Sequence, residues 1–165
     1  MVDLYLEENF KERKKLFMLI QVIGAFFAVL AMSVILSVPK KFLFYSSFVG
    51  AAGWLVYLLM LKTGAIETIG IFVATLAAAL ISHSFARLFK APVTIFLIPA
   101  ILPTVPGVGM YRIVYYMIIG DRNMTGYYFS QTLQIAGMIA IAIFIMDTVF
   151  RTAKQTTYAK KSKNS

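Results

Sequence analysis

Cysteine is absent from the 165-residue chain, histidine occurs once, and charged residues make up only 14% of it. Without cysteine the chain can form no disulfide, no thiolate metal site and no cysteine nucleophile, and its redox compartment cannot be inferred. With so few charges, and with 60% of residues apolar, a soluble domain with a polar surface is hard to build. Composition therefore predicts a membrane protein.

Acidic residues are also scarce, with 7 Asp and Glu against 16 Lys and Arg, which gives a net charge of +9. The basic residues cluster at the two ends of the chain, outside the apolar runs, as they do in the cytoplasmic flanks of membrane proteins. A nucleic-acid site would need exposed aromatics on a water-soluble platform, whereas the aromatics here lie mostly inside apolar runs. We therefore expect no nucleic-acid partner.

Uncharged runs of roughly 20 residues, enough to cross ~30 Å of hydrocarbon, organise the chain. They predict an all-α, polytopic membrane helix bundle of four to five spans, with short connections between antiparallel neighbours. The predicted spans cover residues 16–38, 42–61, 66–88, 93–120, which prolines break, and 128–150.

Three parts follow from this pattern. Residues 1–15 form a charged, amphipathic segment that is either a short interfacial helix or a frayed polar extension. Residues 16–150 form the transmembrane bundle. Residues 151–165 are polar and basic, and we expect them to be a disordered tail.

Small residues should mark the faces where helices touch, because lipid is as apolar as leucine and cannot drive their association. Four sets of small residues share a helix face at the required spacing: Gly24 and Ala28; Gly50 and Gly53; Gly70, Ala74 and Ala78; Ala136 and Ala140.

Topology depends on the broken segment. Five full crossings would place the two basic ends on opposite sides of the membrane, whereas a re-entrant segment over 93–120 would place both in the cytoplasm. The two arrangements give almost the same excess of basic residues inside. We expect a multi-pass plasma-membrane protein with a cytoplasmic C-terminus and leave the side of the N-terminus open.

The broken segment, "IPAILPTVPGVGMYR", is the most informative motif. Pro99, Pro103 and Pro106 each remove an N–H and free the carbonyl four residues earlier, at Ile95, Pro99 and Leu102. Their spacing places the freed carbonyls on one helix face, which at membrane depth needs water, a polar partner or a ligand. A helix that merely kinks around its neighbour is the alternative.

After the prolines a helix restarts near Val108, and its unpaired N–H groups and dipole favour an anion. Gly107 and Gly109 flank that start, Arg112 adds a positive charge one turn later, and Thr104 supplies a hydroxyl at the break. Broken helices with N-termini aimed at a carboxylate are a recurring device of secondary transporters. We take these residues and the three prolines as a candidate substrate path.

Other polar groups in the spans could couple transport to protons. His83, the only histidine, could take part in a proton relay but could equally be a packing residue, and Glu67 and Asp147 lie near span ends. Gln131 and Gln134 are expected to bond between helices. The spans contain no paired acids, no Ser with a His base and no metal-ligand cluster, so we expect no enzyme activity, no metal and no cofactor.

The stretches "SFVGAAGWLVYLLMLKTG" and "FVATLAAALISHSFARLFKAPVTIFLIPAILPTVPGVGMYR" resemble the threonine/serine exporter family. The likeness covers roughly residues 40–150, and Pro99, Pro103, Pro106 and Gly107 match the family motif position for position. The resemblance is to the short subunit, which implies pairing with a larger membrane subunit and export of threonine or serine or, in related pairs, dicarboxylates such as succinate.

These observations lead us to expect a subunit of a secondary exporter of small carboxylate metabolites. The alternatives are a dicarboxylate exporter subunit and a non-transporting partner that stabilises a larger transporter subunit. The partners we expect are that larger subunit and the lipid bilayer, with homo-oligomers as an open possibility.

Overall fold

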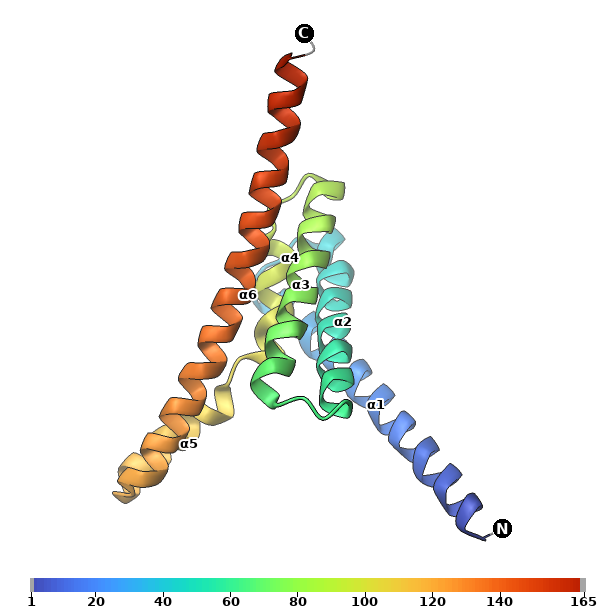
Figure 1. Ribbon diagram of the computed structural model, residues 1–165, viewed down its shortest axis with the longest axis vertical. Coiled ribbons are helices and arrows are strands. Elements are labelled where there is room, and N and C mark those ends of the chain that lie inside the picture. Colours follow the sequence, from blue (N-terminus) through green and yellow to red (C-terminus); the bar gives the residue numbers. More distant parts are fainter. Residues whose placement is uncertain (1, 164–165) are drawn as a thin grey trace.

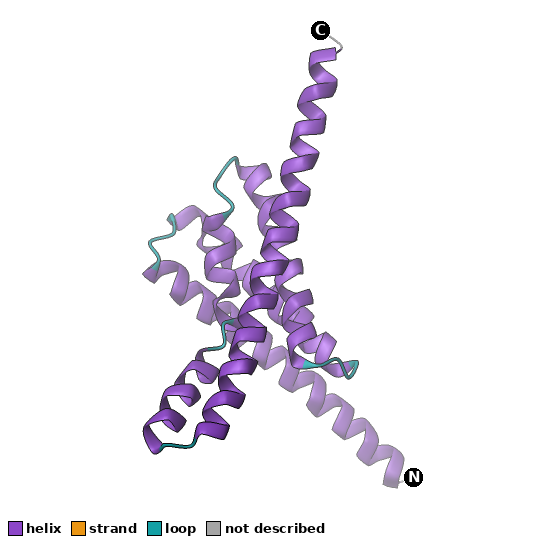
Figure 2. Ribbon diagram, turned by 60° about the vertical axis from the view of Figure 1, so that its left-hand side comes forward, coloured by secondary structure: helices purple, strands orange, loops and turns teal. Residues whose placement is uncertain are grey.

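The regular structure is helical throughout, as the composition predicts. The computed structural model describes the backbone of residues 2–163 and the side chains of residues 12–152, and no strand occurs in this part. The helices, drawn in Figures 1 and 2, are α1 Val2–Ile35, α2 Leu43–Lys62, α3 Glu67–Phe89, α4 Thr94–Ile101, α5 Gly107–Ile119 and α6 Arg122–Lys163, with 3₁₀ turns η1 Lys40–Phe42 and η2 Leu102–Thr104.

Within the part of the chain that the structure describes, four helical segments are long and apolar enough to cross a membrane: Glu12–Ile35, Lys40–Lys62, Glu67–Phe89 and Arg122–Thr152. The two helices on either side of the prolines are each too short to cross a membrane but are long and apolar enough together. If this bent pair counts as one span, the described residues contain five spans. This confirms the predicted membrane helix bundle of four to five spans.

The two ends of the chain continue the outermost helices. The backbone of residues 2–15 joins the first span without a break in α1. At the other end α6 stays helical through Lys163, which differs from the disordered tail expected from residue 151. Ala, Lys, Gln and Arg favour helix, and no glycine or proline follows Gly137 to stop it. The predicted amphipathic character of residues 1–11 and the charges beyond 152 lie outside the described side chains.

Glycines end α2 and α5. Gly64 and Gly120 have φ of +85° and +84°, a left-handed conformation that glycine adopts without a steric penalty. Directly after Gly120, the carboxylate of Asp121 accepts a hydrogen bond from the Met124 N–H at 3.0 Å and caps the start of α6. The tight connection makes α5 and α6 an antiparallel hairpin, which leans away from the other helices in Figure 2.

The bundle is built around α2 and α3. α1 packs on α2, α4 packs on both α2 and α3, and α6 crosses α3, whereas α5 packs mainly on α6. One small core joins Val49, Ala78 and Ala100 from α2, α3 and α4. Another joins α3 to α6 through Ile71 and two isoleucines of α6.

Small residues make the close contacts of α2 and α3, as predicted. A Cβ on Gly50 would lie 2.5 Å from Cγ2 of Val29 on α1, and a Cβ on Gly53 would lie 3.3 Å from Cβ of Ala78 on α3. Ala74 and Ala78 are almost fully buried. These helices approach closely because neither presents a bulky side chain at the contact.

The same prediction is wrong for α1 and α6. Gly24 and Ala28 are exposed, as are Ala136 and Ala140. The buried face of α1 is instead one residue further round and carries Ala25, Val29 and Ser33, while α6 buries Ile135, Ile139 and Ala142. Val29 fits the notch at Gly50, so the small residue is needed on one helix of the pair and not on both.

The two ends of the chain lie at opposite ends of the bundle (Figure 1). The α2–α3 connection and the tip of the α5–α6 hairpin lie toward the N-terminal end, and the α3–α4 connection lies toward the C-terminal end. The broken segment thus runs from one end of the bundle to the other. We predict from this course that the segment is a broken span and not a loop that returns to its starting side.

Candidate functional site

Three prolines divide the fourth apolar segment into two helices. Pro99 lies inside α4, Pro103 lies in η2, and Pro106 directly precedes α5. At the break, the chain direction bends by 49° between the helical segments Thr94–Thr104 and Gly107–Ile119. Proline cannot donate a backbone hydrogen bond and its ring clashes with the preceding turn, so the closely spaced prolines account for both the bend and the 3₁₀ turn.

The protein itself supplies partners to two of the freed carbonyls. The Ser46 hydroxyl on α2 lies 3.0 Å from the Ile95 carbonyl oxygen, to which it can donate. The Val105 N–H donates to the Leu102 carbonyl at 3.2 Å. These contacts are the polar partners that such carbonyls need at membrane depth.

The start of α5 presents backbone donors. The helix begins at Gly107, one residue before the predicted restart, and the Gly107 N–H turns back to the Val105 carbonyl at 2.8 Å. The next two N–H groups, of Val108 and Gly109, have no hydrogen-bond partner within the described residues. They point out of the positive end of the helix, where a negative group is favoured.

A cavity of about 240 Å³ lies against this helix start. Its walls come from the break and from the facing parts of α2, α3 and α6. The residues that line it are Trp54, Tyr57, Glu67, Ile71, Pro103, Thr104, Val105, Pro106, Gly107, Val108, Gly109, Arg112, Tyr128, Gln131, Thr132 and Ile135.

Two opposite charges line the cavity without neutralising each other. Arg112 donates to the Tyr128 hydroxyl at 3.2 Å and lies over its ring, with Cζ 5.0 Å from the centroid. Glu67, at the first turn of α3, forms no ion pair with any described side chain, and neither does Arg112. The cavity therefore offers a positive and a negative group from different helices.

Thr132 adds a hydroxyl that is buried and has no hydrogen-bond partner among the described residues. It comes from α6 and packs directly against Gly109, where an added Cβ would collide with the hydroxyl oxygen. The absence of a side chain at Gly109 therefore lets the Thr132 hydroxyl lie directly against α5. An unpaired buried hydroxyl costs free energy, which a bound polar group could recover.

The family model described as Threonine/Serine exporter, ThrE, matches residues 21–149 of the chain. The chain belongs to the threonine/serine exporter family. No curated protein and no solved structure matches it. The matched range includes all the cavity-lining residues and every proline of the break. Family membership makes this a membrane protein with exporter-type transport as its function.

In this exporter-family chain, most of the residues predicted for the substrate path line the one cavity. They are Pro103, Thr104, Pro106, Gly107, Gly109 and Arg112. Pro99 does not line the cavity. It lies inside α4 and is buried against the neighbouring helices, where it affects the shape of α4. Glu67, predicted separately as a proton-coupling group, also lines the cavity.

Sequence reasoning missed the aromatic and hydroxyl lining. The sequence pattern did not mark Trp54 and Tyr57 of α2, or Tyr128 and Thr132 of α6, as site residues. The spacing of Tyr128, Gln131 and Thr132 could have revealed the lining from α6, because these three polar residues share one face at the start of that helix. The prediction that Gln131 and Gln134 bond between helices is wrong for Gln134, which donates to Ser130 on its own helix at 3.3 Å.

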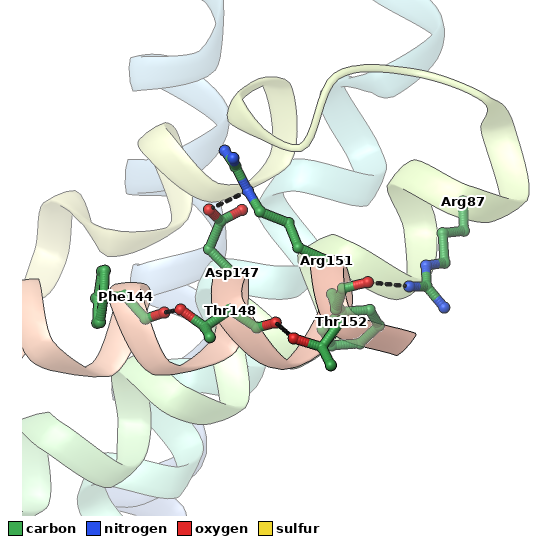
Figure 3. A network of polar contacts seen from close by, with 7 residues as sticks. Arg87, Phe144, Asp147, Thr148, Arg151 and Thr152 are labelled. Carbon is green, nitrogen blue, oxygen red and sulfur yellow. Dashed lines mark hydrogen bonds and ion pairs between the residues drawn. The ribbon is translucent and has the colours of Figure 1, made fainter. Parts of the chain in front are cut away.

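His83 and Asp147 lie elsewhere in the exporter-family chain, toward the far end of α3 and α6. His83 is 16 residues after Glu67 on α3, about 24 Å along the helix axis. Its ring is buried and stacks on Phe150 of α6 with centroids 4.5 Å apart. Asp147 pairs with Arg151 at 2.7 Å (Figure 3).

Arg87 ties the two helices together at this end. Its guanidinium donates to the Phe150 carbonyl at 2.8 Å and lies 4.5 Å from the centroid of the Phe150 ring. Figure 3 shows it reaching from α3 to α6. The arrangement is a helix-to-helix contact remote from the cavity. Within the described residues, no three His, Asp or Glu side chains gather as metal ligands would.

Proposed function

We propose that the chain is one subunit of a secondary exporter that moves threonine- and serine-type amino acids out of the cell and binds them in the cavity at the helix break. The observation that carries this proposal is the pair of un-neutralised opposite charges, Arg112 and Glu67, in one cavity with the open start of α5. A free amino acid carries the complementary pair, a carboxylate and an ammonium.

The size and chemistry of the lining agree with such a ligand. Pockets for drug-sized ligands are about 300–1,000 Å³, so about 240 Å³ suits a smaller metabolite. We assign the carboxylate to the Val108 and Gly109 N–H groups with Arg112 beside them. The ammonium then faces Glu67 and the rings of Trp54 and Tyr57, which attract a cation.

The second candidate substrate class is a dicarboxylate. Its first carboxylate could use the same α5 start, but its second would approach Glu67, and like charges at close range repel. Glu67 thus favours an amino acid over a dicarboxylate.

Glu67 also offers a route to coupling with a proton gradient. A proton on this carboxylate removes the charge that holds the ammonium, so protonation and substrate binding compete at one group. His83 and Asp147 lie far from the cavity, so we assign the coupling role to Glu67 and a packing role to His83.

A larger membrane subunit of the same family completes the exporter in this proposal. The support is the resemblance to the short subunit. The alternative, in which this chain only stabilises a larger transporter, predicts that the larger subunit moves substrate alone at the full rate per molecule.

The test is efflux of labelled threonine and of labelled succinate from proteoliposomes that hold the purified chain, its co-purified partner, or both. Arg112→Gln should lower threonine efflux more than tenfold, since hydrogen bonds to charged groups contribute about 1.5–3 kcal/mol. Glu67→Gln should lower threonine efflux and spare or raise succinate efflux.

Arg122→Gln is the matched control, because Arg122 is exposed at the start of α6 and does not line the cavity. Equal losses in Arg112→Gln and Arg122→Gln would contradict the cavity as the site. Succinate efflux that exceeds threonine efflux in the unaltered protein would contradict the amino-acid assignment, and full activity of the partner alone would contradict a transporting role.

A further inference from the structure

A second hollow lies between α1 and α2, away from the cavity at the break. It is a groove of about 610 Å³, and we call it the α1–α2 groove. Its lining residues are Arg13, Lys14, Phe17, Met18, Gln21, Leu58, Leu61 and Lys62. In Figure 1 the N-terminal half of α1 diverges from the bundle on this side.

The groove is amphipathic along its length. Arg13 and Lys14 lie near the start of the first membrane span, and Lys62 ends the second. Because α1 and α2 are antiparallel, these three cations meet at one end of the groove. Phe17 and the leucines of α2 line the rest with apolar surface.

The three cations have no acidic partner among the described side chains. The neighbouring Lys15 does have one, since its Nζ lies 3.7 Å from Glu12. Among residues 12–152, no acidic side chain lines the groove. Within that part of the chain, three positive charges are thus left without compensation where an apolar groove meets the membrane surface.

From this geometry we propose that the α1–α2 groove binds a phospholipid with an anionic headgroup. Its phosphate contacts Arg13, Lys14 and Lys62, and one acyl chain lies along Phe17, Leu58 and Leu61. The depth fits, because the cations stand at the span ends, which is headgroup level, and the apolar lining stands within the spans. Basic pockets between membrane helices are suited to anionic headgroups.

Other occupants match the groove less well. The basic C-terminal end of the chain carries the same sign of charge as the rim. A hydrophobic partner helix would cover the apolar lining but leave the three cations uncompensated. Arg13 and Lys14 also lie outside residues 21–149, so the groove extends beyond the part shared with the exporter family.

The experiment measures lipid retained by the purified full chain. The protein is exchanged into detergent with mixed phosphatidylglycerol and phosphatidylcholine, and bound lipid is counted by native mass spectrometry. We expect one phosphatidylglycerol to be retained in preference to phosphatidylcholine. The triple variant Arg13→Gln, Lys14→Gln, Lys62→Gln should bind it roughly a hundredfold more weakly, at about tenfold or less per charge.

A control variant with Lys40→Gln, Lys90→Gln and Arg122→Gln removes the same charge from exposed positions outside the groove and should keep the lipid. Leu61→Trp fills the groove without changing its charge and should also release it, which keeps the test valid if the triple variant misfolds. Glycerol phosphate, which has the headgroup charge without acyl chains, should not displace the lipid.

Equal retention of the two lipids, or equal loss in the control variant, would overturn the proposal. So would displacement by glycerol phosphate, which would assign the rim to a soluble anion, or displacement by the co-purified larger subunit, which would make the groove a protein interface. None of these outcomes depends on efflux, so the proposal stands or falls separately from the transport site.

Discussion

The Thr132 hydroxyl is buried against Gly109 without a partner, at the point where α5 and α6 close on the cavity. Ser82 on α3 is a second buried hydroxyl in the same condition, but it does not line the cavity. Both hydroxyls are buried without a partner, but only that of Thr132 lies at the cavity. Substitutions of the two residues can therefore distinguish a role in ligand binding from a role in stability.

We predict that Thr132→Val lowers threonine efflux and leaves the protein as stable or more stable, by up to about 1 kcal/mol, because an unpaired buried hydroxyl is removed. Ser82→Ala should have the same effect on stability and none on efflux. Thermal unfolding in detergent and efflux from proteoliposomes measure the two quantities. Undiminished efflux in Thr132→Val would exclude its hydroxyl from the site.

At this scale the sequence indicates some site residues and hides others. Pro103, Pro106 and Arg112 were predictable because proline and charge are rare and costly inside a membrane. Trp54 and Tyr57 were not, since aromatic residues are common in apolar spans, and only the packing of α2 against α3 brings them to the cavity.

At the scale of elements, the hydrophobic runs, with glycine and proline between them, predicted the ends of every apolar segment to within six residues. They failed to predict which face of a helix is buried where that face depends on the neighbouring helix. The buried face of α1 carries Val29 and not Gly24, because Gly50 on α2 provides the space. Small-residue spacing shows that a helix can pack closely but does not identify its partner.

This pairing predicts opposite outcomes for two Gly→Ala substitutions. Gly50→Ala should destabilise the protein by about 1–3 kcal/mol, because the new Cβ would lie 2.5 Å from Val29 and force α1 away from α2. Gly24→Ala meets no atom within 4 Å and should be neutral or stabilising by up to about 1 kcal/mol through helix propensity. Unfolding in mixed micelles with increasing denaturing detergent measures both.

A double substitution tests whether contact with Val29 causes the effect of Gly50→Ala. Val29→Ala together with Gly50→Ala removes the two methyl groups that collide and should recover part of the lost stability. Equal effects of Gly50→Ala and Gly24→Ala would mean that the α1–α2 contact is not the close approach described here.

At the scale of the whole molecule, α4 and α5 follow one another from one end of the bundle to the other, and the two ends of the chain lie at opposite ends of it (Figure 1). We predict from this course that the two ends lie on opposite sides of the membrane. Sequence alone left this open, because charge counts barely distinguish five crossings from four with a re-entrant loop. The direction in which α5 leaves the break depends on its pairing with α6. No periodicity in the sequence encodes that direction.

Single cysteines can test the topology, since the chain has none of its own. Thr63→Cys, Asn123→Cys and Lys40→Cys each add one thiol at an exposed position at or next to the end of a span. A membrane-impermeant maleimide applied to intact cells should give Thr63→Cys and Asn123→Cys the same result, labelled or protected, and Lys40→Cys the opposite result. Labelling of Asn123→Cys together with Lys40→Cys would instead indicate a re-entrant loop.

The pairing of α5 with α6 has a mechanical consequence. The cavity has one wall on the α2–α3 part of the bundle and the other on the α5–α6 hairpin, and the two parts are joined across the turn at Val105 and Pro106. A molecule that touches both walls would therefore contact α2, α3, α5 and α6 at once. Its binding would oppose any separation of the hairpin from α2 and α3.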